Sequence, residues 1–209
     1  MNYLTLMTMI ALALSTRDPR EPDPNLCLTP IRPKEITVNF DQAFDQLMGW
    51  EGGGVLHEVE GDWGGATKWG ISQRSYPMLD IPNLTEDDAK DLLWAKYWNT
   101  VRASQIAPEL RWDVFDFGVN AGYRISARTL QKSINLCRRA RGDRRHPLKV
   151  DGDVGSLTLE GAREEEPERL LRVFRAYRTK HYMKLAEEYR GQAKFIHGWL
   201  RRAEGGANG

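Results

Sequence analysis

Cysteine is scarce in this chain, because only Cys27 and Cys137 occur among its 209 residues. Two cysteines do not make a disulfide framework, and their spacing matches no metal-binding motif. We expect a buried thiol at Cys137, which follows Leu130 and Ile134 on an apolar helix face. A Cys27–Cys137 bridge in an oxidising compartment is the open alternative. Clusters of His, Cys and Asp are also lacking, so no metal and no cofactor is expected.

The chain lacks an excess of charge of either sign. Lys and Arg number 30 against 29 Asp and Glu, a formal net charge of +1, which gives no general attraction to nucleic acid. The local exception is the arginine-rich loop 138–146, which has no interleaved aromatic residues and no nucleic-acid motif. Attraction to an anionic cell envelope, or plain solvation, is the favoured interpretation, and no nucleic-acid partner is expected.

A hydrophobic run long enough to cross a bilayer is missing as well. Residues 1–15 are uncharged and rich in Leu, Met, Ala and Thr, but a span needs about 20 apolar residues. A basic start is absent, yet Ala11-Leu12-Ala13 and Ser15 resemble the small-residue end of a signal peptide. A cleaved export signal, a weak anchor and a stray hydrophobic terminus compete, and export in some form is favoured.

Proline is concentrated in one place, since five of the ten prolines lie within residues 17–34. This composition cannot form a core and predicts an extended linker over residues 16–37. The remaining length allows one full domain and a small second one.

The folded part starts with an amphipathic helix that ends at an acidic residue. The apolar stripe of this helix has helical spacing: Phe40, Ala43, Phe44, Leu47 and Met48. Glu51 continues the stripe to within roughly 20°, so its carboxylate is expected on the buried face, and the glycines 52–54 stop the helix. Burial and the helix dipole would raise the pKa of Glu51, as a general acid requires. A carboxylate that merely ends the helix in solvent is the alternative.

A glycine-rich hairpin follows this acid. Residues 62–65 (Asp-Trp-Gly-Gly) are a turn signal, and residues 66–72 are predicted to form a short strand bounded by glycines. This order lets Asp62 and Thr67 face Glu51 across a cleft, which is the arrangement that glycoside hydrolysis needs. The alternative is that both side chains only stabilise the turn.

The linked motifs resemble glycoside hydrolase family 108, the N-acetylmuramidases with a lysozyme-like fold. The family forms Glu-Gly-Gly-Tyr-Val, Asp-Pro-Gly-Gly-Ala-Thr and Tyr-Gly-Ile-Thr are similar to residues 51–55, 62–67 and 69–72. Further matching stretches are Tyr97-Trp98, 115–122 and 150–155. The resemblance covers about residues 38–203. It implies an all-α, lysozyme-like fold with a small β-hairpin beside the active site and a helical C-terminal extension.

The resemblance also implies roles for the acidic residues. Glu51 would be the general acid, Asp62 the leading second carboxylate, and Thr67 the group that orients water or Asp62. Two departures stand out. Gly54 replaces the family tyrosine, and the loop between Glu51 and Asp62 is two residues longer, which leaves Glu60 as a rival second carboxylate.

Three further residues are candidates for binding sugar. Trp69 lies in the hairpin, where little else would bury it. Trp98 either lines the sugar cleft or completes the core. Asn120 would hydrogen-bond an acetamido group or cap its helix together with Gly122. His181, in the longest helix, is expected in the core or at its boundary.

The expected organisation comprises an export or anchor segment, a linker, a catalytic domain, a peptidoglycan-binding-like part and a tail: 1–15, 16–37, 38–140, 141–203 and 204–209. The stretch 109–120 is hydrophobic nearly all round, which is typical of a central buried helix.

The favoured role is that of a phage endolysin. It would be made in the cytoplasm of a Gram-negative host and would act on periplasmic peptidoglycan as a monomer, with transient membrane association through residues 1–15. The alternatives are a muramidase of a bacterial secretion system, a peptidoglycan-binding module inactivated by Gly54, and a nucleic-acid-binding protein.

Overall fold

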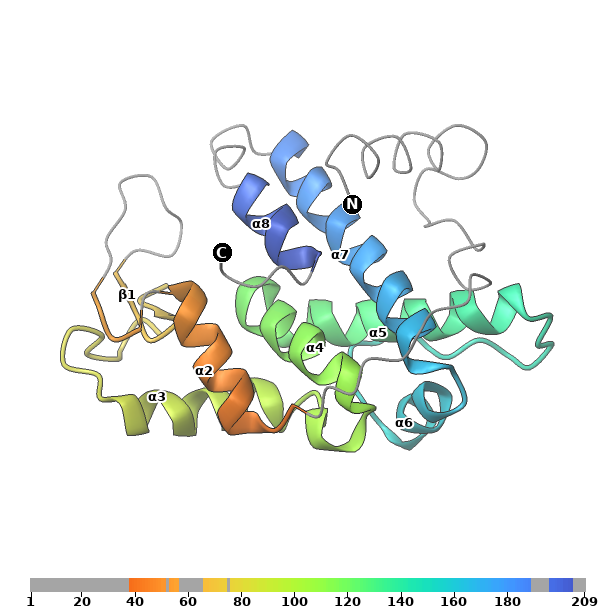
Figure 1. Ribbon diagram of the computed structural model, residues 1–209, viewed down its shortest axis with the longest axis horizontal. Coiled ribbons are helices and arrows are strands. Elements are labelled where there is room, and N and C mark those ends of the chain that lie inside the picture. The colour runs from red at the N-terminus through yellow and green to blue at the C-terminus, as the bar shows by residue number, and fades with distance from the viewer. Residues whose placement is uncertain (1–37, 52, 57–65, 75, 189–195, 205–209) are drawn as a thin grey trace.

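The structure is a computed structural model that describes residues 38–51, 53–56, 66–74, 76–188 and 196–204, with residues 50 and 51 described by their backbone (Figure 1). The expected segment 1–15 and linker 16–37 therefore lie outside the described residues. The helices and strands of this described part are α2 (Phe40–Glu51), β1 (Thr67–Lys68), β2 (Ile71–Ser72), α3 (Glu86–Leu93), the π-helix η2 (Trp94–Trp98), the 3-10 helix η3 (Ala103–Gln105), α4 (Pro108–Ala121), α5 (Tyr123–Ala140), α6 (Ser156–Arg163), α7 (Pro167–Glu188) and α8 (Ile196–Ala203). The predicted fold class, all-α with one small hairpin, is confirmed. No helix of this described part is long and apolar enough to span a bilayer.

Helix α2 begins with a reciprocal cap. The side chain of Asn39 accepts from the backbone N–H of Gln42, and the side chain of Gln42 accepts from that of Asn39. This arrangement satisfies two amide groups that would otherwise lack helical partners. The predicted apolar stripe then faces inward, with Ala43, Phe44 and Leu47 almost fully buried.

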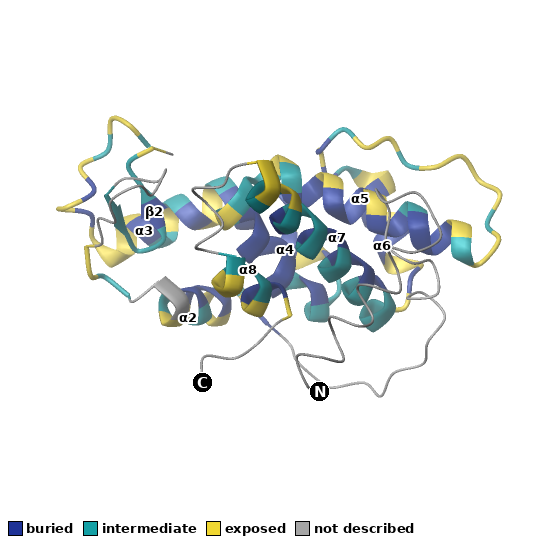
Figure 2. Cartoon of the chain, turned by 90° about the horizontal axis from the view of Figure 1, so that it is seen from above, coloured by how far each residue is buried: buried dark blue, intermediate teal, exposed yellow. Residues whose placement is uncertain are grey.

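Helix α4 is the central helix that its all-round apolar pattern predicts, and Figure 2 shows it largely buried between its neighbours. On one side the ring of Phe115 packs edge-on against Phe40 of α2, with 5.9 Å between ring centroids. On another side the ring of Phe117 meets Phe174 and Tyr182 of α7, at 5.9 Å and 5.6 Å. The two halves of the chain therefore share one core.

The C-terminal half packs directly onto this helix. Helices α5 and α7 both contact α4, and α8 packs against α7. The rings of Tyr182 and Trp199 stack between α7 and α8, 5.3 Å apart. Cys137 is buried on α5, as its position on the apolar face predicts, whereas Cys27 lies outside the described residues.

The arginine-rich loop is held by acidic residues. Arg145 lies 2.7 Å from a carboxylate oxygen of Asp143 and 2.7 Å from one of Glu164. Hydrogen bonding by Arg145 is the main reason that the pKa of Glu164 falls to about 2. Arg138 and Arg141 also pair with Glu164. Much of the positive charge of this loop is thus neutralised within the fold.

Candidate active site

The helix that carries the predicted acid ends where the sequence predicts. Glu51 is the last residue of α2, and Gly53 follows with a left-handed φ of 65°. The N–H of Gly53 donates to the carbonyl of Met48 at 2.9 Å, a bond of the type that closes helix C-termini. The side chain of Glu51 lies outside the described residues, as do Asp62 and its rival Glu60.

The stretch 66–72, predicted as one strand, is itself the hairpin, made of two two-residue strands on either side of a turn. Thr67 pairs with Ser72, and Lys68 pairs with Ile71. The two loop residues, Trp69 and Gly70, both have positive φ, 54° and 71°, as a type I′ turn requires. Ile71 is 1% exposed, so the pair formed with Lys68 faces the core. Because side chains alternate along a strand, Thr67 and Ser72 lie on the opposite face.

Trp69 packs against Gly54. The indole Nε1 donates to the carbonyl of Leu84 at 3.1 Å, which anchors one edge of a half-buried ring. A Cβ atom built on Gly54 would lie only 2.2 Å from Cζ2 of Trp69. The ring therefore fills the space in which any side chain at position 54 would start. The family motifs have tyrosine where this chain has Gly54 and where it has Trp69. We interpret the two differences as one paired change in packing, because the larger indole occupies the space that a side chain at position 54 would need.

Trp98 belongs to the core, which corrects its assignment as a sugar-binding residue. The side chain is 2% exposed, and its ring packs edge-on against Phe40 and Phe115, both at 5.6 Å. Its Nε1 donates to the hydroxyl of Ser104 at 2.8 Å. An indole whose faces and polar edge are both used inside the protein has no surface left for a ligand.

Asn120 is exposed near the end of α4. The helix is closed by Gly122, whose N–H donates to Gly118 at 2.9 Å, while the Oδ1 of Asn120 accepts from the Tyr182 hydroxyl at 3.0 Å. At the other end of α4, Arg111 donates to the Val38 carbonyl, just before α2. Helices α2 and α4 therefore start together and end on the same side of the molecule (Figure 1). Glu51 is the last residue of α2, and Asn120 is the last but one of α4.

A line of polar contacts, called here the polar seam, joins α4 to α7 and includes Asn120. Three residue pairs share a sequence separation of 62 and follow one helix face at i, i+3 and i+7: Asp113–Arg175, Asp116–Arg178 and Asn120–Tyr182. A constant separation means that the two helices run parallel, in register. The guanidinium of Arg175 donates two hydrogen bonds of 2.8 Å to the carboxylate of Asp113.

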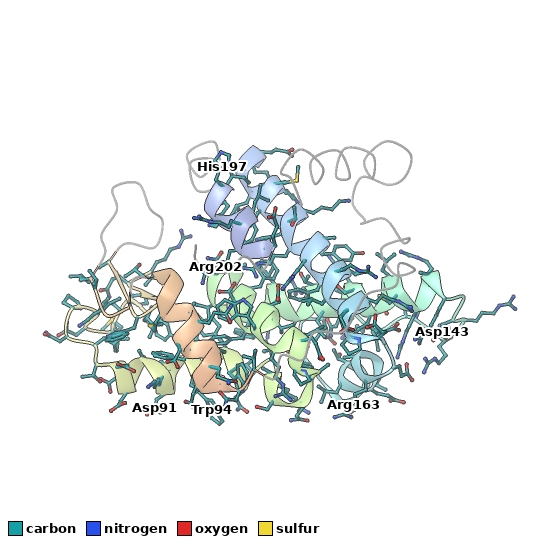
Figure 3. The ribbon with its side chains drawn as sticks, viewed as in Figure 1. Asp91, Trp94, Asp143, Arg163, His197 and Arg202 are labelled. Carbon is teal, nitrogen blue, oxygen red and sulfur yellow. The ribbon has the colours of Figure 1, made fainter. Side chains whose placement is uncertain are left out.

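Asp116 and its partner Arg178 are the most buried members of this seam. The side chain of Asp116 is 0% exposed, and it also accepts from Arg202 of α8 at 2.7 Å; Figure 3 shows Arg202 at the end of α8 nearest α4. Burial alone would raise the pKa of Asp116, but the charges of Arg202 and Arg178 bring it below its usual value. The carboxylate therefore stays ionised and ties three helices together.

The seam was missed in the sequence, although a signal was present. The largely apolar helix α4 carries two Asp three residues apart, and the later helix α7 carries four Arg at the same spacing, at positions 169, 172, 175 and 178. Buried carboxylates need partners, so the shared spacing indicates ion pairs between these two helices, and the packing of the helices decides which Arg residues form them.

Other titratable groups near the site have structural surroundings. His181 packs edge-on against Phe117 at 5.4 Å, and burial is the main cause of its lowered pKa. This agrees with the predicted core or boundary position. Among the described residues, no group of three His, Cys, Asp or Glu could hold a metal ion.

Comparisons with known proteins divide the chain at the end of α4. Residues 44–122 match the family model described as Glycosyl hydrolase 108, and residues 126–204 match the model described as Predicted Peptidoglycan domain. The solved structure of Brucella abortus SagA is similar, with a TM-score of 0.63 and 21% identity over 79% of this chain and 89% of that chain. At this identity the likeness shows a shared fold. No curated protein matches the chain.

Proposed function

Because this chain belongs to the glycosyl hydrolase 108 family and is a glycoside hydrolase, we propose that it is an N-acetylmuramidase. Its substrate would be the β-1,4 bond between N-acetylmuramic acid and N-acetylglucosamine. The second match, to a predicted peptidoglycan domain, supports peptidoglycan as the polymer that contains this bond. The observation that carries the proposal is the end of α2 at Glu51, followed by a hairpin that carries Thr67 on its outer face.

In this mechanism Glu51 protonates the glycosidic oxygen as the bond breaks. Asp62 either stabilises the positive charge on the sugar or activates water from the other side, and Thr67 orients that water or Asp62. Trp69 and Asn120 would contact the sugars. The packing of Trp69 on Gly54 supports an active enzyme over an inactivated binding module. The indole fills the space next to Gly54, where the side chain of the family tyrosine would begin.

A zymogram on purified peptidoglycan tests the proposal. Wild-type protein should clear the substrate, and Glu51→Gln should lose about 10²- to 10⁴-fold in rate, because a positioned general acid contributes that much. Glu187→Gln, the same change at an exposed residue of α7, is the matched control and should clear normally. Clearing by Glu51→Gln as fast as by wild type would show that the assignment is wrong.

For the biological role we propose a monomeric phage endolysin that acts in the periplasm of a Gram-negative host. The uncharged segment 1–15 supports export with transient membrane association. N-terminal sequencing of periplasmic protein should show whether this segment is removed. A muramidase of a bacterial secretion system is the alternative.

A further inference from the structure

The polar seam between α4 and α7 ends at an exposed amide. Asp116 and Tyr182 are almost fully buried, whereas Asn120 reaches the surface. Arg178 links the two buried residues, since its guanidinium bonds to the carboxylate of Asp116 and, at 3.3 Å from both Nε and Nη2, to the hydroxyl of Tyr182. The orientation of Asn120 is therefore controlled from inside the protein.

The donors and acceptors along this chain fix the direction of each bond. A guanidinium only donates, so the Tyr182 oxygen is the acceptor in both contacts from Arg178. The single hydroxyl proton must then go to Asn120, and the atom that receives it must be Oδ1, not Nδ2. The opposite amide orientation would leave the proton without an acceptor. The exposed atom of Asn120 is therefore the NH₂ group.

The hydroxyl of Tyr182 keeps this role over a wide pH range. Burial raises its pKa above the usual tyrosine value, more than the neighbouring Arg178 lowers it. Its ring is also held by stacking on Trp199 and by edge-on packing against Phe117. Both the ring and the proton are thus fixed before any ligand arrives.

We propose that Tyr182 is a positioning residue that presents the NH₂ of Asn120 as a hydrogen-bond donor to the acetamido carbonyl of an N-acetylated sugar. This inference rests on the proposed function, because it takes peptidoglycan as the ligand. Tyr182 lies in the peptidoglycan-domain match and Asn120 in the glycosyl hydrolase match. The C-terminal half therefore contributes to glycan selectivity by setting the geometry of a residue in the catalytic half.

The test compares two oligosaccharides of equal length, tetra-N-acetylchitotetraose and its fully de-N-acetylated form, for binding to the full chain at a salt concentration that screens charge. Wild type should bind the acetylated form about 3- to 10-fold more tightly, the range expected for one neutral hydrogen bond. Asn120→Ala should lose this preference. Tyr182→Phe should lose most of it, because the amide is then free to turn. The double variant should be no worse than Asn120→Ala.

Tyr177→Phe is the matched control, since it removes a hydroxyl from a buried ring of the same helix, five residues earlier. It should keep the wild-type acetyl preference even where it lowers stability. Retention of the preference by Tyr182→Phe, with loss in Asn120→Ala, would overturn the positioning role. Equal binding of both sugars by wild type would overturn the donor assignment. Sugar binding is measured without hydrolysis. A protein that prefers the acetylated sugar but does not clear peptidoglycan would therefore refute the proposed function and leave the positioning role of Tyr182 intact.

Discussion

Substituting Gly54 by alanine should destabilise the protein through Trp69. The new Cβ would lie 2.2 Å from the indole Cζ2, so the ring must withdraw by about 1 Å or more to reach ordinary contact distance. Its Nε1 is held 3.1 Å from the Leu84 carbonyl, and a shift of that size stretches this bond beyond hydrogen-bonding range. Overpacking costs about 1–3 kcal/mol and the lost hydrogen bond about 0.5–1.5 kcal/mol.

The expected loss is therefore about 2–4 kcal/mol in the free energy of unfolding, or roughly 5–15 °C in Tm for a chain of this length. The measurement is a double-mutant cycle by chemical denaturation. In a Trp69→Ala background the clash is absent, and Gly54→Ala should be neutral or stabilising by up to about 1 kcal/mol, because φ at Gly54 is not positive. A coupling energy of about 2–5 kcal/mol follows.

Gly198→Ala is the matched control for this cycle. Gly198 lies inside α8, and a Cβ built there meets nothing within 4 Å among the described residues. The same substitution should therefore stabilise the protein slightly, by about 0.5–1 kcal/mol. If Gly54→Ala costs the same with and without the Trp69 ring, the paired-packing explanation for the missing tyrosine is refuted.

Two further predictions concern charge. Asp116→Asn leaves two buried arginines without their carboxylate, so calorimetry should show a loss of about 3–5 kcal/mol, and an unchanged Tm would contradict the seam. Hydrogen bonding by Arg145 lowers the pKa of Glu164 to about 2, so the stabilisation from this ion pair is complete above the ordinary carboxylate pKa and is lost as pH falls through about 2. Between about pH 5 and pH 2, Glu164→Gln should therefore unfold with a shallower pH dependence than wild type, and identical curves would argue against it.

Much of the fold follows from local patterns in the sequence. The apolar stripe and the glycines after Glu51 predict where α2 ends, since helix periodicity and left-handed glycine are local properties. The all-round apolar stretch predicts the buried position of α4 for the same reason. The position of the hairpin turn does not follow in this way: the pattern of residues 66–72 predicts one strand, but Trp69 and Gly70 both adopt positive φ and turn the chain in its middle.

The aromatic residues show where local patterns fail. Trp69 and Trp98 are the same residue type in neighbouring motifs, yet one closes a surface turn and the other fills the core. Their surroundings come from Leu84, Gly54 and Phe115, which are distant in the sequence. Tertiary neighbours decide whether an indole is offered to a ligand, and composition or spacing does not carry that information.

The seam also bears on how the two family matches relate to each other. Asp113 and Asp116 lie in the first match, and the arginines that neutralise them lie in the second. A buried carboxylate without its partner costs several kcal/mol, so the catalytic half, if separated, would retain two such groups on its central helix. Each half thus completes the core of the other. The two matches therefore form one packed unit, in which charged residues of α7 and α8 neutralise the buried carboxylates of α4.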